Sequence, residues 1–392
     1  MRTVLTAENL WNGTSLIEHP VVVIEDGRVE SIDSRSTAEL PSTPECQVFD
    51  FPGATLAPSF FDVHTHGAAG HDVMEATPGA LHTMGRFLAS HGTGSYLATT
   101  VTAPLDATLR SLSGLAKLIA NPPDTGEPTT WPIGIHLEGP FLSHSKRGVH
   151  PPSLLLDPDI ALFDRFYEAA EGHIRLMTLA PELPGALEFA AHATSRGVRV
   201  SLGHSNATAA DTRAAIAAGA VSATHTFNAM RPLDHREPGI LGIVLTTDSL
   251  FAELICDGIH NTPEMAKIWW RCKGPERAIL ITDAMSATGM PDGAYQLGSF
   301  TVLVANGRAM VGDVLAGSVL TLDKALTNFL AFTGGTLEQG LRLLTANPAA
   351  MTGLADRAGS LTVGQPANLV AVDNKGKLAA SFLNGNRATT LR

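Results

Sequence analysis

An alternation of short apolar runs and longer helical stretches, which begins at Ala57, constrains the fold more than any other feature of the sequence. This alternation is typical of repeated βα units that build a parallel sheet. The predicted strands end near Val63, Thr100, Glu138, Ala180, His204, His225, Cys256 and Asp283. The predicted helices include Leu81–Ala89, Leu105–Leu118, Ala186–Ser195, Ala209–Ala218 and Pro263–Cys272. Eight strands with interleaved helices predict an α/β fold, a (β/α)8 TIM-like barrel.

The segments outside this alternation predict a small β domain built from both chain termini. Two β-rich runs, Val21–Ile24 and Val29–Ile32, flank Asp26-Gly27, a dipeptide typical of hairpin turns. Three further runs are strand-like, namely Ser360–Val363, Asn368–Val372 and Ser381–Leu383. We therefore predict a β-sandwich domain over 1–54 and 359–392 and a barrel domain over 55–358. A barrel of about 250 residues leaves room for insertions, such as the glycine-rich, β-like stretch Gly293–Val311.

The composition is that of a folded globular protein. Hydrophobic residues make up 44% and charged residues 17% of the 392 residues, which excludes a disordered chain. The formal net charge is −11, from 27 Lys and Arg against 38 Asp and Glu, and this sign excludes general nucleic-acid binding. No apolar run reaches the roughly 18 to 20 residues of a membrane span, and the N-terminus lacks a signal pattern. Three cysteines without CxxC spacing fit a reduced compartment, so we expect a cytoplasmic protein without nucleic-acid or membrane partners.

Histidine and carboxylate residues stand at the ends of the predicted strands. His64 and His66 follow the first strand, Glu138 ends the third, His204 the fifth and His225 the sixth, His260 follows the seventh, and Asp283 ends the eighth. In a barrel these ends share one face, where the active sites of such enzymes are assembled. Imidazoles together with carboxylates suit zinc, iron or a similar divalent ion. A single histidine at a strand end is more often a hydrogen-bonded structural residue, but such groups at six strand ends predict a metal site.

The remaining histidines fall outside this pattern. We expect surface or packing roles for His19, His82, His91, His173 and His192. His71 and His144 lie near the predicted site in the sequence, and their roles stay open.

Several longer motifs surround the strand-end residues. The first strand carries Phe61-Asp62-Val63-His64-Thr65-His66-Gly67. Further motifs are Ile135–Phe141, Lys146–His150, Gly203–Ala207, Thr224–Met230, Arg236–Gly239, Asp257–His260, Thr282–Met285 and Leu315–Ser318. On these motifs the sequence resembles the amidohydrolase superfamily, and within it the N-acetylglucosamine-6-phosphate deacetylase family. The resemblance runs over essentially the whole chain.

The resemblance implies metal-dependent hydrolysis of the acetamide of N-acetyl-D-glucosamine 6-phosphate to D-glucosamine 6-phosphate and acetate. It implies that Glu138, His204 and His225 are the principal metal ligands. Asp283 matches the residue that takes a proton from metal-bound water and later delivers one to the leaving amine. His150 matches a catalytic histidine that helps to polarise the acetyl carbonyl. The implied substrate contacts are Val149, His150, Asn228, Ala229, Arg236, His260, Leu315, Ala316 and Gly317.

The resemblance also bears on assembly and metal content. Arg236 matches a sugar-phosphate contact that comes from the neighbouring subunit of a homodimer. Because this chain keeps His64 and His66, it can build a second site with Glu138 bridging, so we expect one or two zinc or iron ions per subunit. The lysine that many other amidohydrolases carry after the fourth strand is absent from Leu176–Glu182, which favours this family over dihydroorotase-like hydrolases.

Three alternatives stay open at this point. A deacetylase for the galactosamine epimer would share every catalytic residue and differ only in its sugar contacts. Another amidohydrolase, acting on a cyclic amide or an amino-purine, would use the same metal core. A non-catalytic barrel that binds a ligand or partner is the third, and the complete set of strand-end ligands argues against it.

Overall fold

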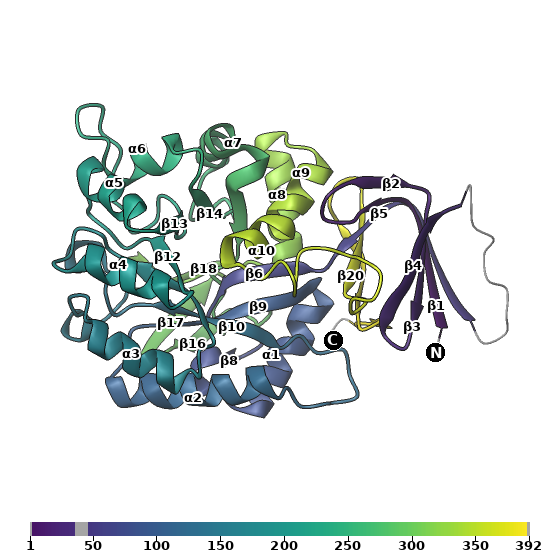
Figure 1. The fold of residues 1–392 in the computed structure, drawn as a ribbon, viewed down its shortest axis with the longest axis horizontal. Helices are drawn as coiled ribbons and strands as arrows, with labels where there is room; N and C mark the ends of the chain where they lie inside the picture. The colour runs from purple at the N-terminus through teal and green to yellow at the C-terminus, as the bar shows by residue number, and fades with distance from the viewer. Residues whose placement is uncertain (1, 36–45, 390–392) are drawn as a thin grey trace.

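The structure is a computed structural model that describes residues 2–35 and 46–389, and its central element is a barrel of parallel strands (Figure 1). In chain order the barrel strands are β6 (Phe60–Thr65), β9 (Thr93–Thr100), β10 (Pro132–Glu138), β11 (Ile174–Leu179), β12 (Arg199–Leu202), β13 (Ala220–Ala223), β14 (Phe251–Ile255) and β15 (Ala278–Ile281). Each strand pairs with the next in parallel. A parallel bridge between Thr65 and Ala284 closes the ring. The predicted (β/α)8 barrel is therefore confirmed, with a strand at each predicted position.

Helices cover the outside of the barrel (Figure 1). They are α1 (Pro78–Ser90), α2 (Leu105–Ala120), α3 (Ile160–Ala169), α4 (Ala186–Ser195), α5 (Ala209–Ala217), α6 (Gly239–Thr246), α7 (Pro263–Arg277), α8 (Leu322–Thr333), α9 (Leu337–Leu344) and α10 (Ala346–Thr352). The five predicted helices correspond to α1, α2, α4, α5 and α7. Strand side chains such as Leu97 and Ile135 pack with helix side chains such as Phe163 and Trp269 in one buried cluster. Burial of this apolar surface is the main force that holds the helices on the barrel.

Local signals explain where several of these helices begin. The Thr77 hydroxyl accepts a hydrogen bond from the Ala80 amide at 3.3 Å, and Pro78 occupies the first turn of α1. α5 begins with a capping box, in which Thr208 and Asp211 each accept from the other's backbone amide. Helix α6 has no side-chain cap at its start. Its apolar residues are buried on all sides, so its sequence also shows no amphipathic period.

Both chain termini contribute to a second sheet beside the barrel, on the right in Figure 1. Its strands are β1 (Arg2–Trp11), β2 (Leu16–Glu18), β3 (Pro20–Glu25), β4 (Arg28–Ser34), β5 (Cys46–Pro58), β20 (Leu369–Asp373), β21 (Leu378–Leu383) and β22 (Asn386–Arg387). β5 joins the two halves, since it pairs in parallel with β1 and antiparallel with β20. Leu5 and Val22 from the first half share a buried cluster with Leu369 and Phe382 from the second, which confirms the β-sandwich. The domain boundaries at 54/55 and 358/359 stay a prediction, and residues 36–45 and 390–392 of the predicted β domain lie outside the described residues.

Two predictions for the terminal sheet had opposite outcomes. The hairpin is present, because Glu25 pairs with Arg28 across Asp26 and Gly27, whose φ angles of 47° and 77° are those of a two-residue primed turn. The predicted strand Ser360–Val363 is wrong, since this segment forms no strand. Leu361 is instead buried in the sheet's core, and its amide donates to the Asn12 carbonyl at 3.0 Å. The apolar pattern there reflects burial rather than strand pairing.

An antiparallel meander follows the last barrel strand, within the stretch that the sequence marked as β-like. Its strands are β16 (Gly293–Leu297), β17 (Phe300–Ala305), β18 (Arg308–Val311) and β19 (Val314–Leu315). A short hairpin, β7 (Gly67–Ala68) and β8 (His71–Asp72), follows the first barrel strand. An Asp72 carboxylate oxygen accepts from the Gly298 amide at 2.7 Å. This hydrogen bond attaches the turn of the meander to the loop after β6.

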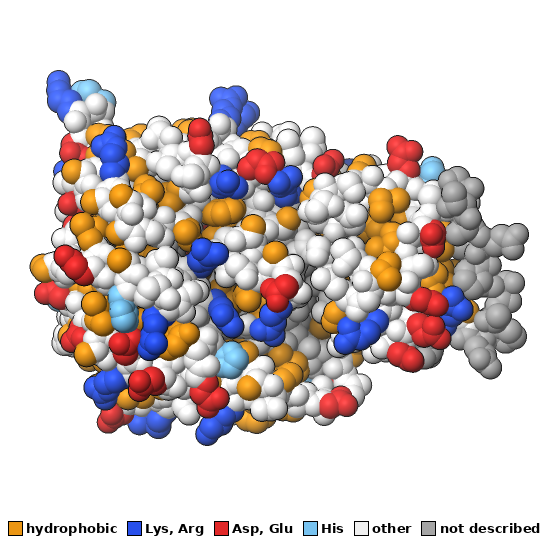
Figure 2. Space-filling view, in the orientation of Figure 1, with side chains coloured by type: hydrophobic (Ala, Val, Ile, Leu, Met, Phe, Trp, Pro, Cys, Tyr) orange, Lys and Arg blue, Asp and Glu red, His pale blue; other side chains and the backbone are white. Residues whose placement is uncertain are grey.

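The cysteines and the charged side chains are distributed as follows. Cys46, Cys256 and Cys272 are all free. On the face drawn in Figure 2, basic side chains are interspersed with acidic ones among the described residues. Over the same residues, no helix is both long and apolar enough to span a bilayer.

Candidate metal centre

Six of the predicted residues meet at the end of the barrel that is formed by the carboxyl ends of the strands. They are His64, His66, Glu138, His204, His225 and Asp283, and each is at most 8% exposed. They form two groups of three whose ligand atoms lie within 4.8 Å of one another. We call His64, His66 and Asp283 the first cluster, and Glu138, His204 and His225 the second cluster. The structure thus brings the predicted ligands together, while their individual roles stay predictions.

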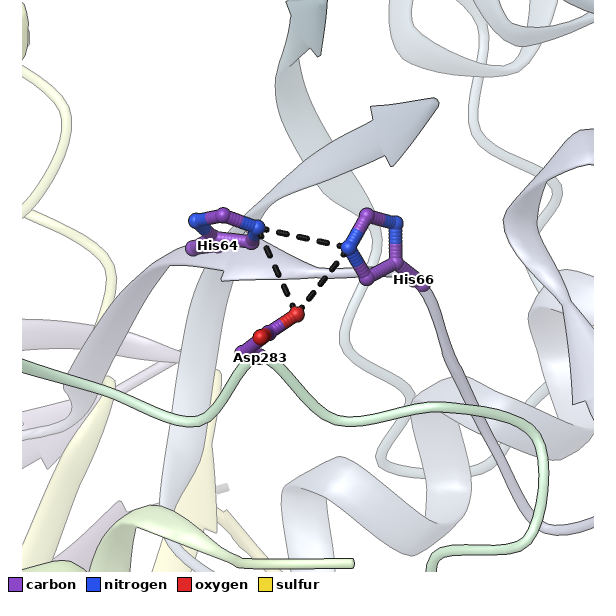
Figure 3. Close-up of side chains that lie close together, drawn as sticks. All are labelled: His64, His66 and Asp283. Carbon is purple, nitrogen blue, oxygen red and sulfur yellow. Dashed lines mark hydrogen bonds and ion pairs between the residues drawn. The ribbon is translucent and has the colours of Figure 1, made fainter. Parts of the chain in front are cut away.

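The first cluster joins the first and last barrel strands. His64 Nε2 lies 3.3 Å from His66 Nε2 and 3.5 Å from Asp283 Oδ1, and His66 Nε2 lies 3.1 Å from the same oxygen. Figure 3 shows the three side chains pointing at a common centre. Backbone pairing sets this geometry, because the Asp283 amide donates to the His64 carbonyl at 2.8 Å. Buried Asp62 adds to it by accepting from the Thr282 hydroxyl at 2.6 Å.

The second cluster lies next to the first, and its Glu138 also approaches imidazoles of the first cluster. Glu138 Oε1 is 3.2 Å from His204 Nε2 and 3.1 Å from His225 Nε2. The other oxygen, Oε2, lies 3.3 Å from His66 Nε2 in the first cluster. One carboxylate therefore faces both groups, which is the position of a bridging ligand.

The donor atoms of both clusters fit a divalent metal. Imidazole nitrogens and carboxylate oxygens, without thiolates, are ligands for zinc and for iron. Hydrogen bonds to the opposite ring nitrogens orient two of the imidazoles: His66 Nδ1 lies 2.9 Å from the Thr99 carbonyl, and His204 Nδ1 lies 2.9 Å from the Lys146 carbonyl. In each case Nδ1 donates, so in the neutral ring that a metal requires, the lone pair of Nε2 is directed into its cluster.

Without metal, these buried groups hold each other in charged forms. Burial opposes charge on His66, but Asp283 and Glu138 outweigh it and raise the pKa of His66 to about 9. Burial also opposes charge on Asp283, yet His64 and His66 lower its pKa to about 2. For Glu138 the neighbouring histidines likewise prevail over burial and lower its pKa well below the usual value. A metal ion would replace the protons as the positive charge between these carboxylates.

Three of the clustered residues adopt left-handed backbone conformations. The φ angles are 46° at His204, 28° at His225 and 50° at Asp283. Such angles cost roughly 1 to 2 kcal/mol for a residue other than glycine. The hydrogen bonds around each residue maintain this strain, which directs the side chains inward where each strand ends.

A pocket of about 300 Å³ opens above the clusters. The predicted site residues that line it are His66, Glu138, Val149, His150, His204, His225, Asn228, Ala229, His260, Asp283, Leu315 and Gly317. Three predicted residues do not line it: His64 is completely buried beneath, Ala316 is buried behind the meander, and Arg236 is exposed on the loop between β13 and α6. Lys146 also lines the pocket.

Two histidines in the pocket are held by fixed partners. The Thr102 amide donates to His150 Nδ1 at 3.4 Å, and the Thr102 hydroxyl lies 2.8 Å from the same nitrogen. Burial lowers the pKa of His150, so the ring is neutral at pH 7 and carries its proton on Nε2. Asp257 Oδ2 accepts from His260 Nδ1 at 2.6 Å, so this ring is fixed in the opposite sense, with a proton on Nδ1.

The histidines that were expected to have surface or packing roles lie away from the pocket. His82 and His91 pair with Glu127 and Asp323, and His192 pairs with Asp164. His19 is exposed and His173 is half-buried, as expected for surface or packing roles. The two open cases also lie outside the lining: His71 pairs with Glu75, and His144 is exposed.

Comparison with known proteins agrees with this geometry. The amidohydrolase family profile matches residues 55–391. The N-acetylgalactosamine-6-phosphate deacetylase of Escherichia coli O157:H7 is 37% identical, over 99% of this chain and 100% of its own length. The N-acetylglucosamine-6-phosphate deacetylase of Bacillus subtilis (strain 168) is 35% identical, over 95% of this chain and 93% of its own. The chain belongs to the amidohydrolase family.

A solved structure is similar to this amidohydrolase over its whole length. It is a mutant N-acetyl-D-glucosamine-6-phosphate deacetylase from Mycobacterium smegmatis, in complex with N-acetyl-D-glucosamine 6-phosphate. Its TM-score is 0.90 and its sequence identity is 36%, with 99% of this chain and 100% of that chain covered. The resemblance inferred from the motifs is confirmed by these matches.

Sequence reasoning missed several residues that support the amidohydrolase site. Asp257 stands in the quoted Asp257–His260 motif, and Thr102 follows the second strand, but neither was assigned a role. Glu253 was also missed, although a charged residue inside the apolar run Phe251–Ile255 indicates a buried carboxylate that needs a partner. It is completely buried, and its carboxylate lies 3.4 Å from His64 Nδ1.

Proposed function

We propose that this amidohydrolase hydrolyses the acetamide of N-acetyl-D-glucosamine 6-phosphate to D-glucosamine 6-phosphate and acetate. The observation that carries the proposal is the position of Asp283 at the floor of the pocket, with an oxygen 3.1 Å from His66 Nε2 and next to both clusters. The similarity to the M. smegmatis enzyme in complex with this compound supports the choice of substrate.

Five residues would hold the metal: His64, His66, Glu138, His204 and His225. We infer two ions per subunit, zinc or iron, because the donor atoms form two clusters and Glu138 lies within 3.5 Å of imidazole nitrogens of both. A bound divalent ion polarises a carbonyl and lowers the pKa of a coordinated water.

Asp283 would move the proton during the reaction. Its carboxylate can accept a proton as the water oxygen bonds to the acetyl carbon. The same proton then passes to the nitrogen as the C–N bond breaks. Collapse of the adduct gives acetic acid and the free amine, and the acid then transfers its proton to the amine. The final products are acetate and the protonated amine, so atoms and charge balance.

His150 would stabilise the negative charge that develops on the acetyl oxygen. Thr102 holds Nδ1, so the Nε2–H points toward the pocket and Glu138, whose Oε2 is 3.6 Å away. A neutral imidazole donating one hydrogen bond to an oxyanion is an established way to lower such a barrier.

Binding of the phosphate would rest on Lys146 and Arg236. Lys146 lies in the pocket of its own chain, whereas Arg236 is exposed and outside it. We propose that Arg236 reaches the pocket of the neighbouring subunit in a homodimer, where its guanidinium can bind phosphate oxygens in a forked geometry. The free cysteines and the reaction's small phosphorylated substrate support a cytoplasmic location.

The proposal is tested by measuring acetate release from purified protein with four compounds. These are N-acetylglucosamine 6-phosphate, its galactosamine epimer, unphosphorylated N-acetylglucosamine, and a cyclic amide such as dihydroorotate. We expect fast release from the first compound and at least tenfold slower release from the unphosphorylated sugar. Turnover of the cyclic amide without any acetate release would refute the proposal and favour another amidohydrolase reaction.

A second candidate is deacetylation of N-acetylgalactosamine 6-phosphate. It is supported by the E. coli relative, which is 37% identical over the full length. The two sugars differ only at one hydroxyl, and the catalytic residues act on a distant acetamide, so the ratio of kcat/KM for the two epimers decides between them.

A further inference from the structure

Glu253 on β14 is a buried carboxylate in the barrel interior. It is completely buried, and its Oε2 atom lies 3.4 Å from His64 Nδ1 and accepts from the His225 amide at 3.2 Å. Its other oxygen, Oε1, has no hydrogen-bond partner among the residues that the structure describes. A buried, half-satisfied carboxylate is costly unless positive charge lies nearby. Within the described chain, its ion pair is with His64.

The His64 ring lies between Glu253 and the other two members of the first cluster. Its Nδ1 faces Glu253, and its Nε2 faces His66 and Asp283 at 3.3 and 3.5 Å. A histidine that donates Nδ1–H to a carboxylate keeps an unprotonated, more basic Nε2 for a metal ion. Glu253 therefore has the geometry of the outer member of a carboxylate–histidine–metal triad.

The other clustered imidazoles lack such support. His66 and His204 are backed by the neutral carbonyls of Thr99 and Lys146. His225 Nδ1 has no hydrogen-bond partner in the part of the chain that is described. Glu253 thus adds negative charge behind one ligand of the first cluster and behind none of the imidazoles of the second.

We propose that Glu253 is a positioning residue that holds the metal ion of the first cluster, by accepting the His64 Nδ1–H and by adding a third negative charge to those of Glu138 and Asp283. The inference rests on the proposed metal dependence, and it specifies which of the two ions depends on Glu253. Loss of such an outer-shell partner weakens metal binding by about 10- to 100-fold.

The test is the zinc content and zinc affinity of Glu253→Gln, independent of any substrate. Glutamine keeps an oxygen that can accept from the His225 amide, so the substitution removes the charge and leaves the backbone contact. Wild-type protein is expected to hold two zinc ions. The variant should keep one ion with unchanged affinity and bind the other about 10- to 100-fold more weakly in a titration against a competing chelator.

Glu182→Gln is the matched control. Glu182 supports the loop of the second cluster by accepting from Ser205 Oγ and the Asn206 amide at 2.7 and 2.6 Å, and it contacts no clustered imidazole. This variant should bind both ions as the wild type does. The inference is overturned if Glu253→Gln binds two ions as tightly as the wild type, or if the wild type itself holds only one ion.

A proton NMR spectrum of the zinc-loaded wild type covers the case in which Glu253→Gln does not fold. A His64 Nδ1–H bonded to a carboxylate is expected as a slowly exchanging downfield resonance, assigned by its loss in His64→Gln. Its absence from the loaded protein would overturn the inference. Acetate release is measured on the same samples, so a protein that binds metal as predicted but fails to deacetylate would refute the proposed reaction and leave the role of Glu253 intact.

Discussion

Metal-free protein is expected to release more than one proton from the first cluster when it binds zinc at pH 7.5. Without metal, the pKa of His66 is raised to about 9 and that of His64 is raised well above its usual value, because nearby Asp283 and Glu138 outweigh the effect of burial. A group with a pKa of about 9 is roughly 97% protonated at pH 7.5, and metal binding requires the neutral imidazole. His66 therefore gives up nearly one proton, and His64 adds to the release because its pKa is raised in the same direction.

The raised pKa of His66 also determines how far the apparent affinity for zinc is weakened at pH 7.5. Removing the proton from His66 at pH 7.5 costs about 2 kcal/mol, since its pKa of about 9 lies some 1.5 units higher. This cost weakens the apparent affinity for zinc by about 30-fold at pH 7.5. The weakening factor becomes about tenfold smaller for each unit of rising pH until the pKa is reached.

The assay is calorimetric titration of zinc into chelated protein in two buffers with different ionisation enthalpies. The slope of the observed enthalpy against the buffer enthalpy is the number of protons released. His66→Asn should release about one proton fewer than the wild type. A slope near zero for the wild type, or an unchanged slope for His66→Asn, would refute the reasoning, because the imidazoles would then be neutral before metal binds.

Four further outcomes are expected. Asp283→Asn should lower kcat by about 100- to 10,000-fold while zinc remains bound, and wild-type turnover would exclude Asp283 as the proton carrier. Thr102→Val should lower kcat about tenfold by freeing the His150 ring, and Thr102→Ser should restore it; equal rates for both variants would argue against this hydrogen bond. Gly139→Ala should lower the thermal unfolding midpoint by several degrees, because φ is 97° and the added Cβ would collide with the Thr102 hydroxyl. For metal-free protein, the charge on His66 contributes stability that is complete below pH 6.5 and lost as pH rises through about 9, so unfolding midpoints should fall over that range; a flat profile would contradict the raised pKa.

The barrel could be predicted because its strands are short apolar runs, and a histidine or carboxylate ends or closely follows several of them. Glu138 closes β10, and His204 and His225 follow β12 and β13 by two residues, so the sequence positions of the ligands coincide with the strand ends. Once the strands form a closed ring, their ends share one face, and the meeting of the ligands follows from topology alone. The Asp-Gly hairpin was predictable for a similar reason, since the turn depends on two adjacent residues.

The rest depends on contacts between distant parts of the chain. Glu253 and His64 are 189 positions apart, and only closure of the barrel shows that their side chains meet. The left-handed backbone at His204 has no sequence signal, because residues other than glycine adopt it only when their surroundings impose it. Leu361 illustrates the opposite error, in which burial by a neighbouring sheet imitates a strand pattern.

The most direct test of the account is acetate release from N-acetylglucosamine 6-phosphate, measured before chelation, after chelation and after zinc is restored, with metal per subunit determined on each sample. The account predicts rapid release with about two ions bound, loss of release when both are removed, and recovery on reloading. Undiminished release from fully metal-free protein, or no release from protein that holds both ions, would contradict it.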